Sequence, residues 1–152
     1  MKKILIALMF LSIFLDAYEA RNLYGEWHTV RETVNGDQRG RESETLQMNP
    51  GGFKIEIKMS TKRGDISIKN LTLVASGIWK VHDKCLAIVV EQVRITGVDE
   101  VHGVDANSLS RLSDGFRSKY LSDPIRIFSI VSATDSTMTL LGEDGYLKNY
   151  RR

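Results

Sequence analysis

The chain has few cysteines, which can cross-link a fold through disulfides, and few prolines, which interrupt helices and strands. Its 152 residues include one cysteine, Cys85, and two prolines. A single cysteine excludes an intramolecular disulfide, so an apolar core and backbone hydrogen bonds must hold the fold together. Cys85 begins the apolar run 85–90, which favours a buried, inert thiol over a catalytic or dimer-forming one.

Neither sign of charge dominates the chain. The 21 lysines and arginines stand against 19 aspartates and glutamates, which gives a net charge of +2. Nucleic-acid-binding domains and polybasic membrane anchors need a marked excess of cations. We therefore expect no nucleic-acid partner.

Motifs for metal binding and catalysis are absent as well. The three histidines, His28, His82 and His102, form no His-x-His or His-x-x-x-His pair, so no metal site is expected. The run 99–105 holds three carboxylates and an imidazole, but their spacing does not match a metal-binding motif. A solvated loop is therefore favoured over a cation site. The sequence contains no Gly-x-Ser-x-Gly motif and no phosphate loop. A catalytic triad formed by residues far apart in the sequence is the remaining alternative. We expect no catalytic residues, no cofactor and no enzymatic activity.

The longest apolar run lies at the start of the chain. Two lysines precede residues 4–15, which are apolar apart from Ser12 and too few to span a bilayer. This pattern predicts a signal peptide over 1–17, with cleavage after Ala17 or as late as Ala20; an uncleaved anchor is the alternative. We expect a periplasmic or secreted protein, with no stable transmembrane anchor and one domain over 21–152.

The remaining chain alternates mostly with a period of two. Phe53, Ile55, Ile57 and Met59 alternate with polar residues, which is typical of a strand with one buried face. Glycine-rich and asparagine-rich turn signals separate many such segments. The apolar parity changes near 69–70 and again between 90 and 93, and each change predicts a β-bulge.

One segment has helical spacing instead. Leu109, Leu112, Phe116 and Tyr120 recur at intervals of three and four, which predicts one short helix around 107–121 inserted between strands. The helix could pack on the barrel wall, close a barrel mouth or dock a protein partner; an irregular loop is the alternative.

Three short motifs carry a family resemblance. Gly25-Glu26-Trp27 opens the first strand, Gly77-Ile78-Trp79 recurs in mid-chain, and Tyr150-Arg151 lies in the last segment. In this order they resemble the lipocalin superfamily of the calycins, and most closely its bacterial lipocalin-like members. The resemblance implies an all-β, up-and-down antiparallel barrel of eight or nine strands, closed at one end.

The resemblance also implies how the barrel is closed. In the family, the first-strand tryptophan packs against a basic residue of the last strand. Here that implies a closure by Gly25, Trp27 and Arg151, with Arg152 as the alternate. Such a cation over an indole face contributes about 0.5–2 kcal/mol. The chain departs from the typical family pattern in two ways. It lacks a Thr-Asp-Tyr-like loop, and its predicted helix lies before the penultimate strands rather than at the C-terminus.

The function implied by the resemblance is binding of a small apolar or amphipathic ligand inside the barrel, in a cavity of at least about 300 Å³. The alternative is a barrel filled by side chains that acts as a protein-interaction module, such as an inhibitor or envelope accessory protein. The candidate lining residues are the apolar side chains of the alternating strands: Phe53, Ile55, Ile57, Leu71, Leu73, Trp79, Ile88, Val90, Ile127 and Met138.

Overall fold

Nine antiparallel strands and one α-helix organise residues 19–152, the part of the chain that the computed structural model describes. The predicted leader, 1–17, lies outside these residues. A short 3₁₀ turn, η1 (Ala20–Leu23), precedes the strands. The strands are β1 (Gly25–Asn35), β2 (Gln38–Asn49), β3 (Gly52–Arg63), β4 (Ile66–His82), β5 (Cys85–Gly97), β6 (Glu100–His102), β7 (Ile125–Ala133), β8 (Thr137–Gly142) and β9 (Leu147–Arg151), and the helix is α2 (Ala106–Ser122).

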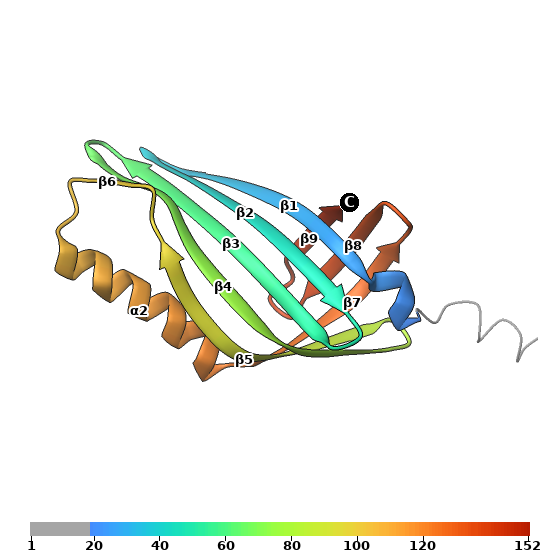
Figure 1. Cartoon of the computed structure of the whole chain (residues 1–152). Coiled ribbons are helices and arrows are strands. Elements are labelled where there is room, and N and C mark those ends of the chain that lie inside the picture. The colour runs from blue at the N-terminus through green and yellow to red at the C-terminus, as the bar shows by residue number, and fades with distance from the viewer. Residues whose placement is uncertain (1–18) are drawn as a thin grey trace, which may run out of the picture.

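Eight of these strands close into a barrel. Each pairs with its neighbour in the order β1 to β5, then β7, β8 and β9, and β9 returns to β1, while β6 adds to β4 alone. The predicted fold class, an up-and-down antiparallel barrel with one inserted helix, is therefore confirmed (Figure 1). Closure between β1 and β9 depends on one register pair, His28 with Arg151.

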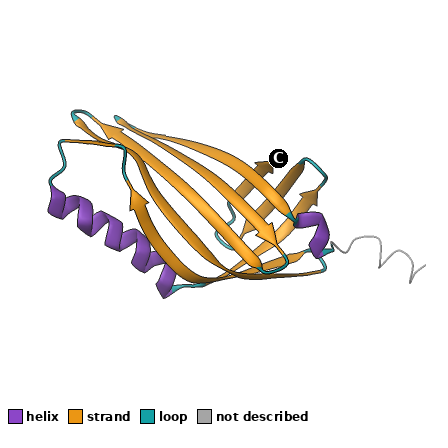
Figure 2. Cartoon of the chain, viewed as in Figure 1, coloured by secondary structure: helices purple, strands orange, loops and turns teal. Residues whose placement is uncertain are grey.

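The barrel is complete at one end and open along one flank at the other. Strands β1 to β5 run from end to end, whereas β7, β8 and β9 have nine, six and five residues and gather at the end that carries η1 (Figure 1). Helix α2 lies alongside the far half of β5 (Figure 2). Asp105 caps α2 by accepting from the Ser108 N–H at 2.9 Å. Phe116 and Tyr120 pack against the core, so α2 covers the open flank.

Two bulges account for the changes of parity in the sequence. The β3–β4 register skips between Met59 and Thr61, and Asn70 on the opposing strand has a φ of 51°. The β4–β5 register skips between Ser76 and Gly77, where β5 contributes the extra residue. At this second bulge the backbones come so close that a Cβ on Gly77 would lie 2.0 Å from the Val89 carbonyl oxygen. Glycine at 77 is therefore a requirement of the bulge.

Trp27 plugs the complete end of the barrel. Its side chain is fully buried, and its Nε1 donates to the Leu23 carbonyl at 2.9 Å. Gly25 enters β1 with a φ of +119°, a conformation that favours glycine. The guanidinium above the indole belongs to Arg152, at 4.1 Å from the ring centre.

The structure thus selects the alternate closing residue and corrects the choice of Arg151. Tyr150 faces the interior, so the period of two turns Arg151 outward, where it is exposed. Arg152 follows the end of β9 and folds back over the closed end. There it donates to the Tyr24 carbonyl at 2.5 Å and the Asn22 carbonyl at 3.3 Å.

The expectations that Cys85 is buried and that Ile127 lines the interior are also wrong, because both residues lie on the outward-facing side of their strands. Cys85 is exposed, because Leu86, Ile88 and Val90 occupy the inner face of β5. Ile127 is 41% exposed, since its neighbour Arg126 shares the inner face of β7 with Phe128 and Ile130. Strand β7 is apolar on both faces, so its sequence does not reveal which face is buried.

Candidate ligand-binding site

The predicted lining residues divide into two groups. All except Ile127 are buried or pack against the buried core. Phe53, Ile55, Ile88 and Val90 line an internal cavity, whereas Ile57, Leu73, Trp79 and Met138 pack in other parts of the core. Leu71 is buried and lines a separate hollow of about 230 Å³ with Leu112 and Phe116 of α2. Trp79 is fixed near the closed end, where its Nε1 donates to the Asn49 carbonyl at 2.9 Å and its ring meets Tyr24 edge-on. Whether the first group binds a ligand stays a prediction.

The internal cavity is smaller than the volume of at least about 300 Å³ expected of a ligand-binding barrel, and part of its lining is polar. Its volume is about 110 Å³, below the ~300–1,000 Å³ of ordinary small-molecule pockets. One wall is the apolar group above. The rest of the lining includes a polar wall formed by the side chains of Glu44, Tyr120, Arg126, Asp144, Lys148 and Tyr150.

Glu44 forms the centre of the polar wall. It lies on β2 in the same parity as Leu46 and Met48, so the strand turns its carboxylate into the barrel, where it is 2% exposed. A buried carboxylate is costly unless it is paired and hydrogen-bonded. Both oxygens have partners from β9: Tyr150 Oη donates to Oε1, and Lys148 Nζ lies 2.6 Å from Oε2.

Two tyrosines in the cluster hold their protons tightly. Burial, and then the nearby Glu44 carboxylate, raise the pKa of Tyr150 well above its usual value of 10.0. Burial and Glu44 also raise the pKa of Tyr120 to about 12, although Arg126 acts in the opposite direction. Both phenols are therefore protonated at physiological pH, and the single O–H of Tyr150 is donated to Glu44.

Arg126 has an unmet hydrogen-bonding group. Its guanidinium carbon lies 4.4 Å from the centre of the Tyr120 ring, a cation–π contact between β7 and α2. Its Nε is buried and finds no hydrogen-bond partner among residues 19–152. An unsatisfied buried donor costs about 1–3 kcal/mol. An acceptor atom on a bound molecule would remove this cost.

Sequence reasoning did not identify the residues of the polar wall. The more polar strand over 41–48 indicates a partly polar interior, and the shared parity of Glu44 with Leu46 could have identified that residue. No local signal identifies Arg126, which sits between two isoleucines that look buried. Its partner Tyr120 comes from the helix, and Glu44 and Tyr150 are 106 residues apart in the chain.

The acidic run 99–105 serves the scaffold. Asp99 accepts from the Asn70 side chain at 2.7 Å, Glu100 pairs with Lys69 at 3.0 Å, and Asp105 caps α2. Within the described chain, no group of three or more histidine, cysteine, aspartate or glutamate side chains is placed to hold a metal ion. No helix among residues 19–152 is long and apolar enough to cross a membrane.

The class of protein follows from the architecture. No protein-family model matches the chain, and no curated protein matches it. The structure shows a closed antiparallel barrel of eight strands with one inserted helix, which is compatible with a lipocalin-like fold. Such barrels enclose either packed side chains or one small ligand, and this barrel combines a filled closed end with a small mixed cavity.

Proposed function

We propose that this chain is an exported, lipocalin-like protein that binds a small amphipathic molecule in the cavity beside α2, and that it acts by binding rather than by catalysis. Support for export comes from the leader-like residues 1–17. Support for a lipocalin-like relationship comes from the barrel and from the tryptophan plug at its closed end. Support for binding comes from the cavity.

The buried, unpartnered Nε of Arg126 is the observation that carries the proposal. A carboxylate or another acceptor on the ligand would satisfy this donor beside Tyr120. The apolar part of the ligand would then contact Phe53 and Ile88 across the cavity, where burial contributes about 25 cal/mol per Å². Glu44 is paired with Lys148, and Arg126 is a cation of this wall with no ion-pair partner among residues 19–152, although the carboxylate of Asp144 lines the same cavity.

The volume limits the size of the ligand. A cavity of about 110 Å³ equals roughly four water molecules at about 30 Å³ each. A short-chain acid fits this space, whereas a long lipophile requires α2 to move away from the barrel. Of the two kinds of ligand expected from the sequence, apolar or amphipathic, the amphipathic one therefore has more support.

Calorimetric titration with two matched series of compounds tests the proposal. One series is short n-alkyl carboxylates and the other is the primary alcohols of equal length. We expect the acids to bind more tightly than the alcohols. Arg126→Met should abolish this preference, because a carboxylate accepts a charge-assisted hydrogen bond from the guanidinium that is roughly twice as strong as the bond a neutral hydroxyl accepts.

Arg111→Met is the matched control, since Arg111 is exposed on α2 and does not line the cavity. Circular dichroism establishes that each variant is folded. If the unsubstituted protein binds neither series, or if both variants weaken binding equally, the cavity is not the binding site. Native mass spectrometry of protein from its own source provides an independent readout, in which a co-purifying small mass is expected.

A further inference from the structure

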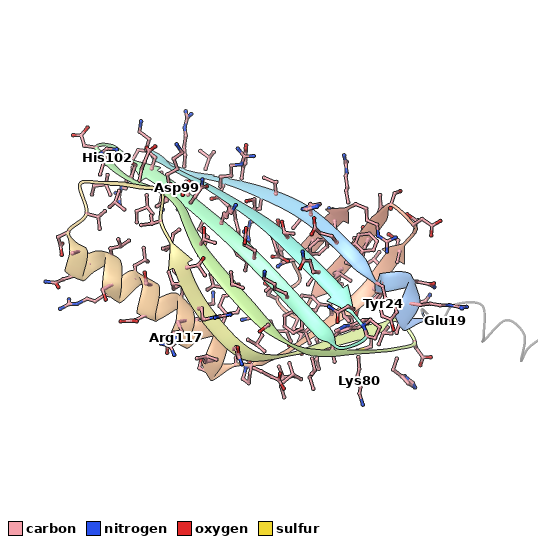
Figure 3. The ribbon with its side chains drawn as sticks, in the orientation of Figure 1. Glu19, Tyr24, Lys80, Asp99, His102 and Arg117 are labelled. Atoms are coloured by element: carbon pink, nitrogen blue, oxygen red, sulfur yellow. The ribbon has the colours of Figure 1, made fainter. Side chains whose placement is uncertain are left out.

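A second hollow lies on the outer wall of the barrel, at the end opposite the tryptophan plug. It is an open groove of about 480 Å³ that crosses β1, β2, β3 and β4. Its floor is the backbone of Thr33, Gly40, Thr61 and Ile68, which are successive partners in the strand registers. Figure 3 labels Asp99 and His102 at this end and Tyr24 at the other.

Two rows of outward-facing side chains form the walls of the groove. One row is Val34, Arg39, Lys62 and Ser67, and each member is paired in register with the next. The other row contains Glu32, Arg41 and Ser60, which are also register partners, and continues to Lys69 and Glu100. Residues two apart on a strand place these rows roughly 7 Å from each other.

The centre of the groove is cationic although the whole chain is nearly balanced. Arg39, Arg41 and Lys62 are exposed, and no carboxylate among residues 19–152 lies within ion-pair distance of any of them. The acidic members stand at the two ends of one row. Glu100 there is already paired with Lys69 at 3.0 Å.

This arrangement is unfavourable for the fold itself. Arg39 and Lys62 are directly opposite each other on neighbouring strands, and like charges at such positions destabilise a sheet. A glutamate at either position would form a cross-strand ion pair. Arg39 and Lys62 therefore weaken the sheet where they face each other, whereas Arg41 faces Glu32, and a bound anion would offset the repulsion between Arg39 and Lys62.

We propose that this groove binds an acidic, extended segment of a partner protein. The distance from β1 to β4 is three strand spacings, or about 14 Å, which about four or five extended residues span. Acidic side chains along such a segment would meet Arg39, Arg41 and Lys62 on both walls, and an apolar side chain at its end would contact Val34, which is 75% exposed.

The shape and composition of the groove favour a peptide over other polyanions. No aromatic side chain among the described residues lines it, whereas single-stranded nucleic acids are bound by stacking of bases on aromatic rings. A membrane presents a broad flat surface, and this hollow lies between two rows of side chains only roughly 7 Å apart. The groove shares no lining residue with the internal cavity, so peptide binding and ligand binding can be tested independently.

Fluorescence anisotropy with a labelled peptide tests the proposal on the purified chain. The probe has about five consecutive glutamates flanked by glycine and serine, and its control has glutamine in place of each glutamate. We expect the glutamate peptide to bind, the glutamine peptide not to bind, and the affinity to fall as salt shortens the Debye length from about 10 Å to about 3 Å.

Lys62→Glu separates a binding role from a structural one. It should weaken binding at least tenfold while the melting temperature stays equal or rises, because the new carboxylate faces Arg39. Lys54→Glu is the matched control: Lys54 is exposed on the same strand but outside the groove, and its substitution should change the affinity less than twofold. Arg39→Gln provides a second variant that introduces no new charge.

Three results would overturn the proposal. The first is a Lys62→Glu or Arg39→Gln protein that binds as the unsubstituted chain does. The second is an equal loss with Lys54→Glu, which would indicate a general charge effect. The third is tighter binding of anionic phosphatidylglycerol vesicles or of a single-stranded oligonucleotide than of the glutamate peptide.

Discussion

The guanidinium of Arg152 lies 4.1 Å from the centre of the Trp27 ring, so the last residue of the chain covers the plug of the first strand. The register between β1 and β9 consists of one pair, and the cation–π contact of Arg152 with Trp27 is a further tie between the end of β9 and β1. Arg152 is therefore part of the barrel closure.

Truncation of the plug should be costly. Trp27→Ala should lower the free energy of unfolding by about 3–5 kcal/mol, because a fully buried indole leaves a cavity. Arg152→Ala should lower it by about 0.5–2 kcal/mol through loss of the cation–π contact. Urea denaturation measures both. Arg151→Ala, on the exposed face of β9, is the control and should change stability by less than about 0.5 kcal/mol; a loss as large as that of Arg152→Ala would show that the closure is wrongly assigned.

Removal of one hydroxyl should expose the dependence of Glu44 on its partners. Tyr150→Phe keeps the packing but removes a hydrogen bond to a buried carboxylate, so stability should fall by about 1.5–3 kcal/mol. Tyr146→Phe is matched to it, since Tyr146 is 38% exposed and its hydroxyl has no part in the cluster. Equal denaturation midpoints for the two variants would contradict the importance of the buried contact.

Alkaline pH should destabilise the protein through the buried phenols. The pKa of Tyr120 rises to about 12 in the folded state from 10.0, so the folded protein holds a proton that the unfolded chain releases. The stabilisation, on the order of 2–3 kcal/mol, is complete below pH ~10 and is lost as the pH rises to ~12. Tyr150 acts in the same direction. The unfolding free energy should fall less steeply across this pH range for Tyr120→Phe than for the unsubstituted protein. Ultraviolet absorbance should show that Tyr120 ionises at a higher pH than the exposed tyrosines. Ionisation of Tyr120 at the same pH as the exposed tyrosines would contradict the prediction.

Two glycine substitutions should have opposite effects. Gly77→Ala forces a Cβ against the Val89 carbonyl at the bulge and should destabilise by more than about 1 kcal/mol. Gly115→Ala lies in α2, where an added Cβ meets nothing within 4 Å, and should stabilise by about 0.5–1 kcal/mol. Thermal denaturation of the pair distinguishes them; a neutral Gly77→Ala would mean that the bulge relaxes freely.

Much of the architecture could be predicted from local patterns. The alternation of Phe53, Ile55 and Ile57 predicts a half-buried strand, and the spacing of Leu112, Phe116 and Tyr120 predicts the helix; both are observed. The parity changes near 69–70 and 90–93 locate real bulges. These features follow from the sequence because the period of a strand or helix and a slip in that period are properties of consecutive residues.

Only the tertiary structure decided which face of an ambiguous strand is buried and which distant side chains meet. Ile127 lies outside and Arg126 inside because β5 and β8, rather than the residues of β7, set the orientation of that strand. Glu44 meets Lys148 across 104 positions of the chain, and Arg152 rather than Arg151 reaches Trp27. Contacts between residues so far apart in the chain depend on strand register and barrel closure, which no local period encodes.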